Sequence, residues 1–136
     1  MIVLDASVVI AYLEPTDAHH ESATELVVDL VADGEHDLVL HPLTAAEVLA
    51  GFVRFGTEEQ AWADLASIGF VVRGLGEGPA AALLIARTRM QSRLKMPDAV
   101  VLATALHHGG VVASYDDALR AAAGKHGVLY AAGEVR

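Results

Sequence analysis

The chain lacks cysteine, has aromatic residues at only 5% of its 136 positions, and has 9 basic residues against 18 acidic ones. The absence of cysteine excludes disulfide bonds and thiolate metal sites. The formal net charge of −9 argues against a protein that binds nucleic acid over a broad surface, because such proteins are usually basic. With 54% apolar residues, a chain of this length can bury a core without cross-links, so we expect a single domain spanning residues 1–136.

Long apolar segments are also missing. The longest runs, such as Ala80–Ala86, are much shorter than the roughly 20 apolar residues that span a bilayer. The N-terminal segment reaches an acid at Asp5 without a basic leader, so it is not typical of a signal peptide. These absences, together with the lack of cysteine, lead us to expect a cytoplasmic protein that does not enter a membrane.

Common catalytic signatures are absent too. The sequence has neither a G-x-S-x-G pattern nor a P-loop, which disfavours a serine hydrolase and a Walker-type NTPase. No H-E-x-x-H spacing occurs, and neighbouring positions on a helix do not share a face, so the two adjacent histidine pairs are poor chelates. We therefore interpret the histidines mostly as surface residues: His19, His20, His36, His41, His107, His108 and His126.

Short apolar runs alternate with amphipathic segments along the whole chain. The runs predict strands at Met1–Leu4, Asp37–His41, Phe70–Arg73, Val111–Ala113 and Val128–Tyr130. Helical spacing predicts helices after the first strand to about residue 14, at about 19–33, 44–55, around Trp62 and Leu65, and at about 80–94, 97–108 and 117–123. This alternation predicts a layered α/β fold with a parallel sheet, in which ligands bind beyond the carboxyl ends of the strands.

Four acidic residues lie where a strand is followed by a helix, or shortly inside the next helix: Asp5, Glu47, Asp98 and Asp116. If the strands are parallel neighbours, all four lie along one edge of the sheet. Four carboxylates in one place repel one another unless a cation holds them. The pattern therefore predicts a divalent-metal site, and hydrolysis of a phosphodiester is the chemistry that such a site most naturally serves.

A helix cap is the alternative for each acid taken singly. The residues from Thr44 to Glu47 match a capping box, in which Glu47 bonds back to the Thr44 amide. Asp98 lies where a helix N-terminus favours an anion, and Asp5 and Asp116 precede expected helices. The apolar surroundings of Asp5 and Asp98 favour the cation hypothesis, because an unpaired buried carboxylate is costly.

Four of the nine basic residues fall within nine positions: Arg87, Arg89, Arg93 and Lys95. They have two interpretations. They can be a solvated helix end, where cations are favoured near the helix C-terminus, or they can contact the backbone of a phosphate-containing ligand. The sequence leaves both open.

The motifs together resemble those of PIN-domain ribonucleases, and among these the VapC toxins of bacterial toxin–antitoxin pairs. The resemblance covers nearly the whole chain and rests on Ile2–Ser7, Glu47, Asp98–Ala105, and the Ser114-x-Asp116 pair followed by Leu119. Ser114 stands where the family usually has threonine, and it keeps the hydroxyl. Tyr115 and Asp117 are less typical, and Asp117 leaves two candidates for the last acid, of which the spacing favours Asp116.

The resemblance implies a three-layer α/β/α sandwich with a short parallel sheet, and an endoribonuclease that depends on Mg²⁺ or Mn²⁺. It implies that Asp5, Glu47, Asp98 and Asp116 hold one or two ions and carry catalysis. Ser7, Ser114 and Asp117 are expected to orient these ligands, and Arg87, Arg89, Arg93 and Lys95 to contact RNA. It also implies a homodimer that is inhibited by a VapB-type antitoxin.

A non-enzymatic protein is the competing hypothesis. It would be an acidic α/β module that binds Mg²⁺ and a protein partner, either receiver-like or a degenerate nuclease scaffold. A receiver-like module would carry an early pair of acids and a lysine after a late strand. Here Asp5 alone follows the first strand, and Lys125 does not follow a strand.

Overall fold

The fold is built on one parallel sheet of four short strands. The computed structural model describes residues 1–131, so the last five positions of the predicted domain lie outside the described residues. The strands are β1 (Ile2–Leu4), β2 (Leu38–Leu40), β3 (Phe70–Val72) and β4 (Val111–Ala113), and their order is β3-β2-β1-β4. Every neighbouring pair is parallel, so all the carboxyl ends lie along one edge, and the predicted parallel sheet is confirmed.

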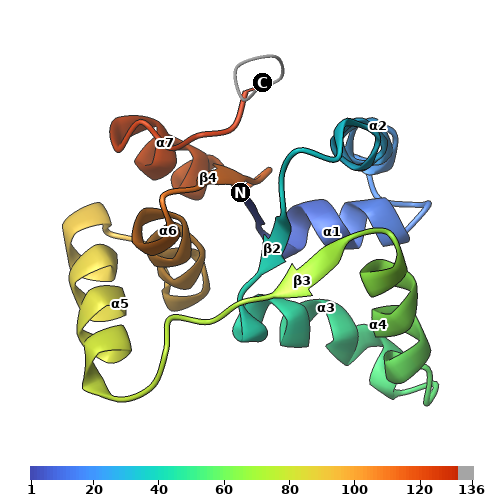
Figure 1. Cartoon of the computed structure of the whole chain (residues 1–136), viewed down its shortest axis with the longest axis horizontal. Coiled ribbons are helices and arrows are strands. Elements are labelled where there is room, and N and C mark those ends of the chain that lie inside the picture. The colour runs from blue at the N-terminus through green and yellow to red at the C-terminus, as the bar shows by residue number, and fades with distance from the viewer. Residues whose placement is uncertain (132–136) are drawn as a thin grey trace.

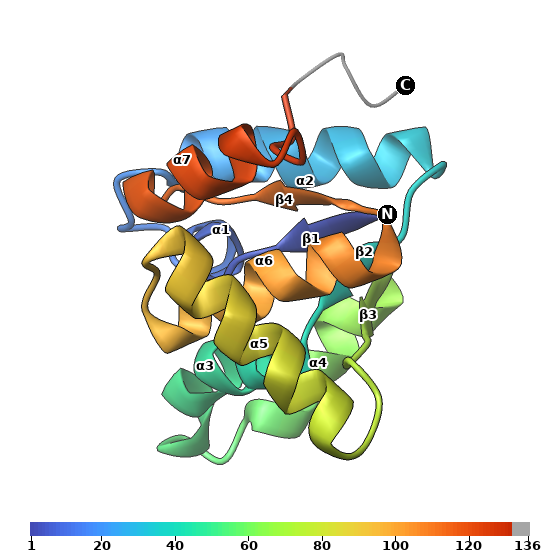
Figure 2. The ribbon, with the colours of Figure 1, turned by 90° about the vertical axis from the view of Figure 1, so that its left-hand side faces the viewer.

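Helices cover both faces of this sheet, as Figures 1 and 2 show. They are α1 (Ala6–Leu13), α2 (His20–Asp33), α3 (Pro42–Val53), α4 (Glu58–Ser67), α5 (Pro79–Ser92), α6 (Met96–His108) and α7 (Asp117–Lys125). One layer contains α1 to α4, and the other contains α6 and α7, with α5 packed on the outside of α6. The predicted α/β/α sandwich is confirmed. None of the helices between residues 1 and 131 is long and apolar enough to cross a membrane.

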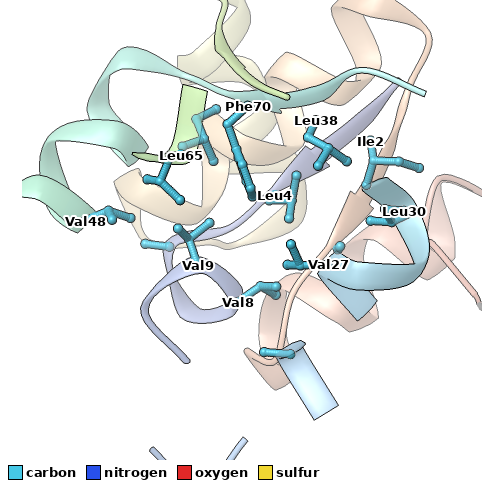
Figure 3. Packing of buried hydrophobic residues seen from close by; sticks show 14 of the residues in the cluster. Ile2, Leu4, Val8, Val9, Val27, Leu30, Leu38, Val48, Leu65 and Phe70 are labelled. Atoms are coloured by element: carbon cyan, nitrogen blue, oxygen red, sulfur yellow. The ribbon is translucent and has the colours of Figure 1, made fainter. Parts of the chain in front are cut away.

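The sheet residues alternate between two hydrophobic clusters, because successive strand side chains point to opposite faces. Ile2 and Leu4 pack with residues of α1 and α2 and with Phe70, as Figure 3 shows. Val3 and Val39 point the other way and pack against α6 and α7. All three strand residues of β1 are fully buried, which explains why β1 reads as an unbroken apolar run rather than as an alternating pattern.

The start of α3 differs from the prediction. The helix begins at Pro42, two residues before the expected start at Thr44. Proline is favoured in the first helical turn, and the His41 Nδ1 atom accepts a hydrogen bond from the Leu43 N–H at 3.0 Å. Thr44 is buried inside the helix, so the capping-box interpretation of Glu47 is wrong.

The expected last strand at Val128–Tyr130 is reduced to a single parallel bridge between Val112 and Leu129. The Val112 N–H donates to the Val128 carbonyl at 2.7 Å, and the Val112 carbonyl accepts from the Tyr130 N–H at 2.8 Å. This segment follows α7 and extends the sheet beside β4 by these bonds alone.

Candidate metal centre

The strand order places the candidate site at a topological switch point. From β1 the chain continues through β2 to β3 on one side of the sheet, whereas β4 pairs with β1 on the other side. Such a reversal leaves a crevice beyond the carboxyl ends of the two adjacent strands. Asp5 directly follows β1, and Asp116 follows β4 after two residues. The Asp5 N–H donates to the Ala113 carbonyl at 2.9 Å, which joins the two strand ends.

Asp5 occupies the N-cap position of α1, yet its side chain does not cap the helix. Its Oδ2 atom accepts two hydrogen bonds instead, from Ser7 Oγ at 2.7 Å and from Ser114 Oγ at 2.8 Å. The residue is only 8% exposed. Within residues 1–131, no hydrogen bond reaches its other oxygen, Oδ1, which leaves that atom available to a ligand.

The two serines are themselves oriented by backbone amides. The Tyr115 N–H donates to Ser7 Oγ at 3.1 Å, and the Asp116 N–H donates to Ser114 Oγ at 2.9 Å. Each hydroxyl therefore accepts from the backbone and donates its own proton to Asp5 Oδ2, which fixes the orientation of the Asp5 carboxyl group. The predicted role of Ser7 and Ser114 in orienting ligands requires these hydrogen bonds.

Asp116 acts as a helix cap and also lies among the acids. Its Oδ1 atom accepts from the Leu119 N–H at 2.9 Å at the start of α7. The cap interpretation therefore applies to Asp116, and its second oxygen, Oδ2, takes no part in the cap. The neighbouring Asp117 is exposed and forms no side-chain hydrogen bond or ion pair within the described part of the chain, and it is not among the charges that shift Glu47 or Asp98, so its predicted role in orienting ligands stays a prediction.

Asp98 has the most strongly shifted pKa of the four acids. It lies in the first turn of α6 without capping it, and its pKa is raised to about 6. Partial burial is the main cause, followed by the negative charges of Asp116 and Asp5 and, more weakly, Glu47, while Lys95 opposes the shift.

Glu47 reaches the same cluster from α3. Its pKa is raised by partial burial of the carboxyl group and then by the charge of Asp5. Asp5 therefore acts on both Glu47 and Asp98, and the four predicted acids form one electrostatic group. Within residues 1–131, no three of these four carboxyl groups have ligand atoms that all lie within 4.8 Å of one another. Among the described residues, only Asp33, Glu35 and His36 form a group of three whose ligand atoms all lie within 4.8 Å of one another.

The donor set fits a divalent cation. It consists of carboxylate oxygens, which are the ligands that Mg²⁺ and Mn²⁺ prefer. The raised pKa values of Glu47 and Asp98 show that these charges are poorly compensated by the protein itself. Lys95 is the only cation that acts on Asp98 in the part of the chain described here.

The basic cluster does not converge on the acids as a group. All four of its residues are exposed, α5 ends at Ser92, and Arg93 caps it in a left-handed conformation with φ of 54°. Lys95 alone acts on Asp98. Contact of Arg87, Arg89 and Arg93 with RNA stays a prediction.

Sequence reasoning missed a stacked ring pair beside the acids. The His19 imidazole stacks on the Tyr115 ring, with 4.2 Å between centroids and 7° between planes. The available signal was the unusual aromatic residue between Ser114 and Asp116, since a scarce residue type in a site loop suggests a specific contact.

An apolar hollow was missed as well. It has a volume of about 300 Å³ and lies between α1 and α3, with Glu47 on its wall. Its apolar lining includes Ile10, Leu13, Phe52 and Phe55, and Phe55 is 74% exposed. An exposed phenylalanine next to a hollow is typical of a surface that a partner covers.

Comparison with known proteins gives a consistent result. The sequence model of the PIN domain matches residues 2–125. VapC20 from Mycobacterium tuberculosis, described as a sarcin-ricin loop cleaving toxin, is 19% identical with a TM-score of 0.65, over 90% of this chain and 95% of that one. FitAcB from Neisseria gonorrhoeae is 24% identical with a TM-score of 0.64, over 91% and 94%. No curated protein matches the sequence. At these identities the two structures show the fold alone.

Proposed function

We propose, because this chain belongs to the PIN domain family, that it is a divalent-metal-dependent endoribonuclease and the toxin of a VapBC-type toxin–antitoxin pair. The observation that carries the proposal is the group of four carboxylates at the switch point of the sheet, where partial burial and then the charges of the neighbouring acids raise the pKa of Asp98 to about 6. A purely structural cluster would lower stability without return.

Asp5, Glu47, Asp98 and Asp116 would hold one or two Mg²⁺ or Mn²⁺ ions, directly or through water. When bound, such ions supply an activated water and neutralise charge on the scissile phosphate. Ser7 and Ser114 fix the orientation of the Asp5 carboxyl through Oδ2, and Oδ1 would be the atom that binds an ion. The Leu119 N–H fixes the Asp116 carboxyl through Oδ1.

Asp98 and Glu47 have the opposite property. Their raised pKa values mean that both carboxyl groups take up protons more easily than ordinary acids. Binding of a metal ion therefore releases protons, and the affinity of the site for the metal rises with pH. Lys95, the cation that acts on Asp98 within the described residues, would contact a phosphate of the bound RNA.

The partner proposal concerns the apolar hollow. An antitoxin segment with apolar side chains would fill it and lie against Glu47, which places an inhibitor at the edge of the acid cluster. We also propose that the protein is a homodimer and acts in the cytoplasm, where RNA is accessible.

A cleavage assay on total RNA tests the function. Purified protein is incubated in Mg²⁺ or Mn²⁺ and in EDTA, beside Asp98→Asn and the matched control Asp117→Asn, whose carboxyl lies outside the cluster. We expect discrete cuts that need metal and Asp98 and persist in the control. Absence of cutting under every condition, with metal still bound by calorimetry, would instead favour a non-enzymatic scaffold.

A further inference from the structure

The His19–Tyr115 stack includes a residue that is next to the acid cluster in the chain, and the proposed metal centre does not use it. Tyr115 is the residue between Ser114 and Asp116, so its ring belongs to the loop that carries two site residues. His19 lies in the loop between α1 and α2, directly before α2 begins at His20. The stack therefore connects the α1–α2 loop with the rim of the acid cluster.

Hydrogen bonds hold both partners in place. The Tyr115 and Ser22 hydroxyls are 2.6 Å apart, and the Tyr115 N–H donates to Ser7 Oγ. The His19 N–H donates to Asp17 Oδ1 at 2.8 Å. A ring that is already ordered in the free protein loses little further entropy when a flat ligand stacks on it.

The two rings differ in their surroundings. Tyr115 is partly buried and packs against the hydrophobic cluster that includes β1 and α1. His19 is exposed, with one face on Tyr115. The stack thus continues outward from the core and ends in an imidazole face that is open to solvent, which is the kind of surface on which an unpaired nucleobase stacks.

The charge of the chain favours contacts with RNA that do not depend on a general attraction of phosphates. With a formal net charge of −9, general attraction of phosphates contributes little. Base–aromatic stacking does not depend on charge and is available to every base. An acidic nuclease can therefore gain affinity for RNA from a ring placed next to its metal ligands.

We propose that the His19–Tyr115 stack is a platform for a nucleobase adjacent to the scissile phosphate, with His19 as the contact surface and Tyr115 as its positioning residue. The inference rests on the proposed function and adds a substrate class to it. The platform selects RNA in which that base is unpaired and exposed, as in single strands and loops, because a base inside a duplex is covered on both faces.

Binding of RNA with and without bases tests the platform. All proteins carry Asp98→Asn so that RNA stays intact, and affinity is measured in Mg²⁺ by fluorescence anisotropy. The probes are a random-sequence pool of short single-stranded RNAs and a pool of abasic ribose-phosphate chains of the same length. We expect His19→Ala to weaken binding of the first pool by about 5- to 150-fold, the effect of losing one base stack, and to leave the second unchanged.

His107→Ala is the matched control, because it removes an exposed imidazole at the end of α6 and leaves the His19–Tyr115 stack intact; its affinity for both pools stays near that of the parent. As a second readout, the imidazole Cε1–H resonance of His19, identified by its loss in His19→Ala, shifts upfield with base-containing RNA only. Equal affinity of parent and His19→Ala, equal loss on both pools, or an unshifted resonance would each overturn the platform.

The cleavage assay separates this inference from the function. Cutting that needs metal and Asp98, together with base-independent binding, removes the platform and leaves the nuclease. Base-dependent binding through His19 without any cutting leaves the platform and removes the nuclease.

Discussion

At the scale of a single residue, Asp98 shows how a cluster of acids lowers the stability of the metal-free protein. Its carboxyl is partly buried beside Asp5 and Asp116, and its pKa of about 6 lies above the ordinary value of 3.8. The folded protein thus binds a proton more tightly than the unfolded chain does. Between these two pKa values the unfolded chain has released the proton and the native state still holds it. The free energy of unfolding therefore falls as pH rises.

We predict that Asp98→Asn stabilises the metal-free protein at pH 7.5. The gain should be about 1–2 kcal/mol after allowance for partial exposure to solvent, which raises the melting temperature by several degrees. It should shrink as pH falls from 6 towards 4, where the wild-type carboxyl is protonated. The measurement is thermal unfolding in EDTA, with the exposed Asp29→Asn as control. A lower melting temperature for Asp98→Asn would support a capping role instead.

The helix α3 shows at the scale of an element how one cap sets the position of a functional side chain. His41 Nδ1 accepts from the Leu43 N–H, so the imidazole must stay unprotonated at that atom. Burial lowers the His41 pKa below 6.5. The unfolded chain therefore binds the proton more tightly, and the stability given by the cap is lost as pH falls below that value.

We predict that His41→Ala costs about 0.5–2 kcal/mol at pH 7.5, the usual worth of an N-cap acceptor. His41→Asn keeps an acceptor that does not titrate, so it should match the wild type at pH 7.5 and exceed it in stability at pH 5.5. Urea unfolding at the two pH values measures both effects. A constant difference between wild type and His41→Asn across this range would argue against the cap.

Much of the element pattern was predictable from the sequence. The buried runs at β1 and β4 and the glycine stops after α2 and α6 depend on local rules, and left-handed Gly34 and Gly109 end the helices as expected. The start of α3 was not predictable in this way, since Thr44 and Glu47 mimic a capping box and histidine is an uncommon cap.

The site was predictable in part for a similar reason. Parallel strands bring their carboxyl ends together, so the convergence of the acids follows from topology. The bond from Ser114 to Asp5, the bond from the Tyr115 N–H to Ser7 and the stack of His19 on Tyr115 each join residues about a hundred positions apart in the chain. Such pairings depend on how the loops pack in three dimensions, which periodicity does not describe.

At the scale of the whole molecule, a divalent cation bound at the proposed site would offset part of the formal net charge of −9 and stabilise the folded state. An ion that binds only the folded state raises stability by about 2.7 kcal/mol at one hundred times its Kd. We predict that Mn²⁺ raises the melting temperature of the wild type and has much less effect on Asp98→Asn, so that the order of the two proteins reverses between EDTA and Mn²⁺. Thermal unfolding across a Mn²⁺ titration measures this.

Asp33→Asn serves as the control, because Asp33, Glu35 and His36 form a separate cluster that could take up metal. It should keep the full response to Mn²⁺. A response lost in Asp33→Asn and kept in Asp98→Asn would place the ion at the end of α2 rather than at the switch point.

The most direct test compares cleavage rates of five single variants on an oligoribonucleotide spanning a cut mapped in total RNA. We predict that Asp5→Asn, Glu47→Gln, Asp98→Asn and Asp116→Asn each lower kcat by about 100-fold or more, because each removes charge that serves the transition state. Asp117→Asn, one residue away, should stay within about threefold of the wild type, because its exposed carboxyl makes no contact with the site. Wild-type rates in any of the four, or an equal loss in Asp117→Asn, would contradict the assignment of the metal centre.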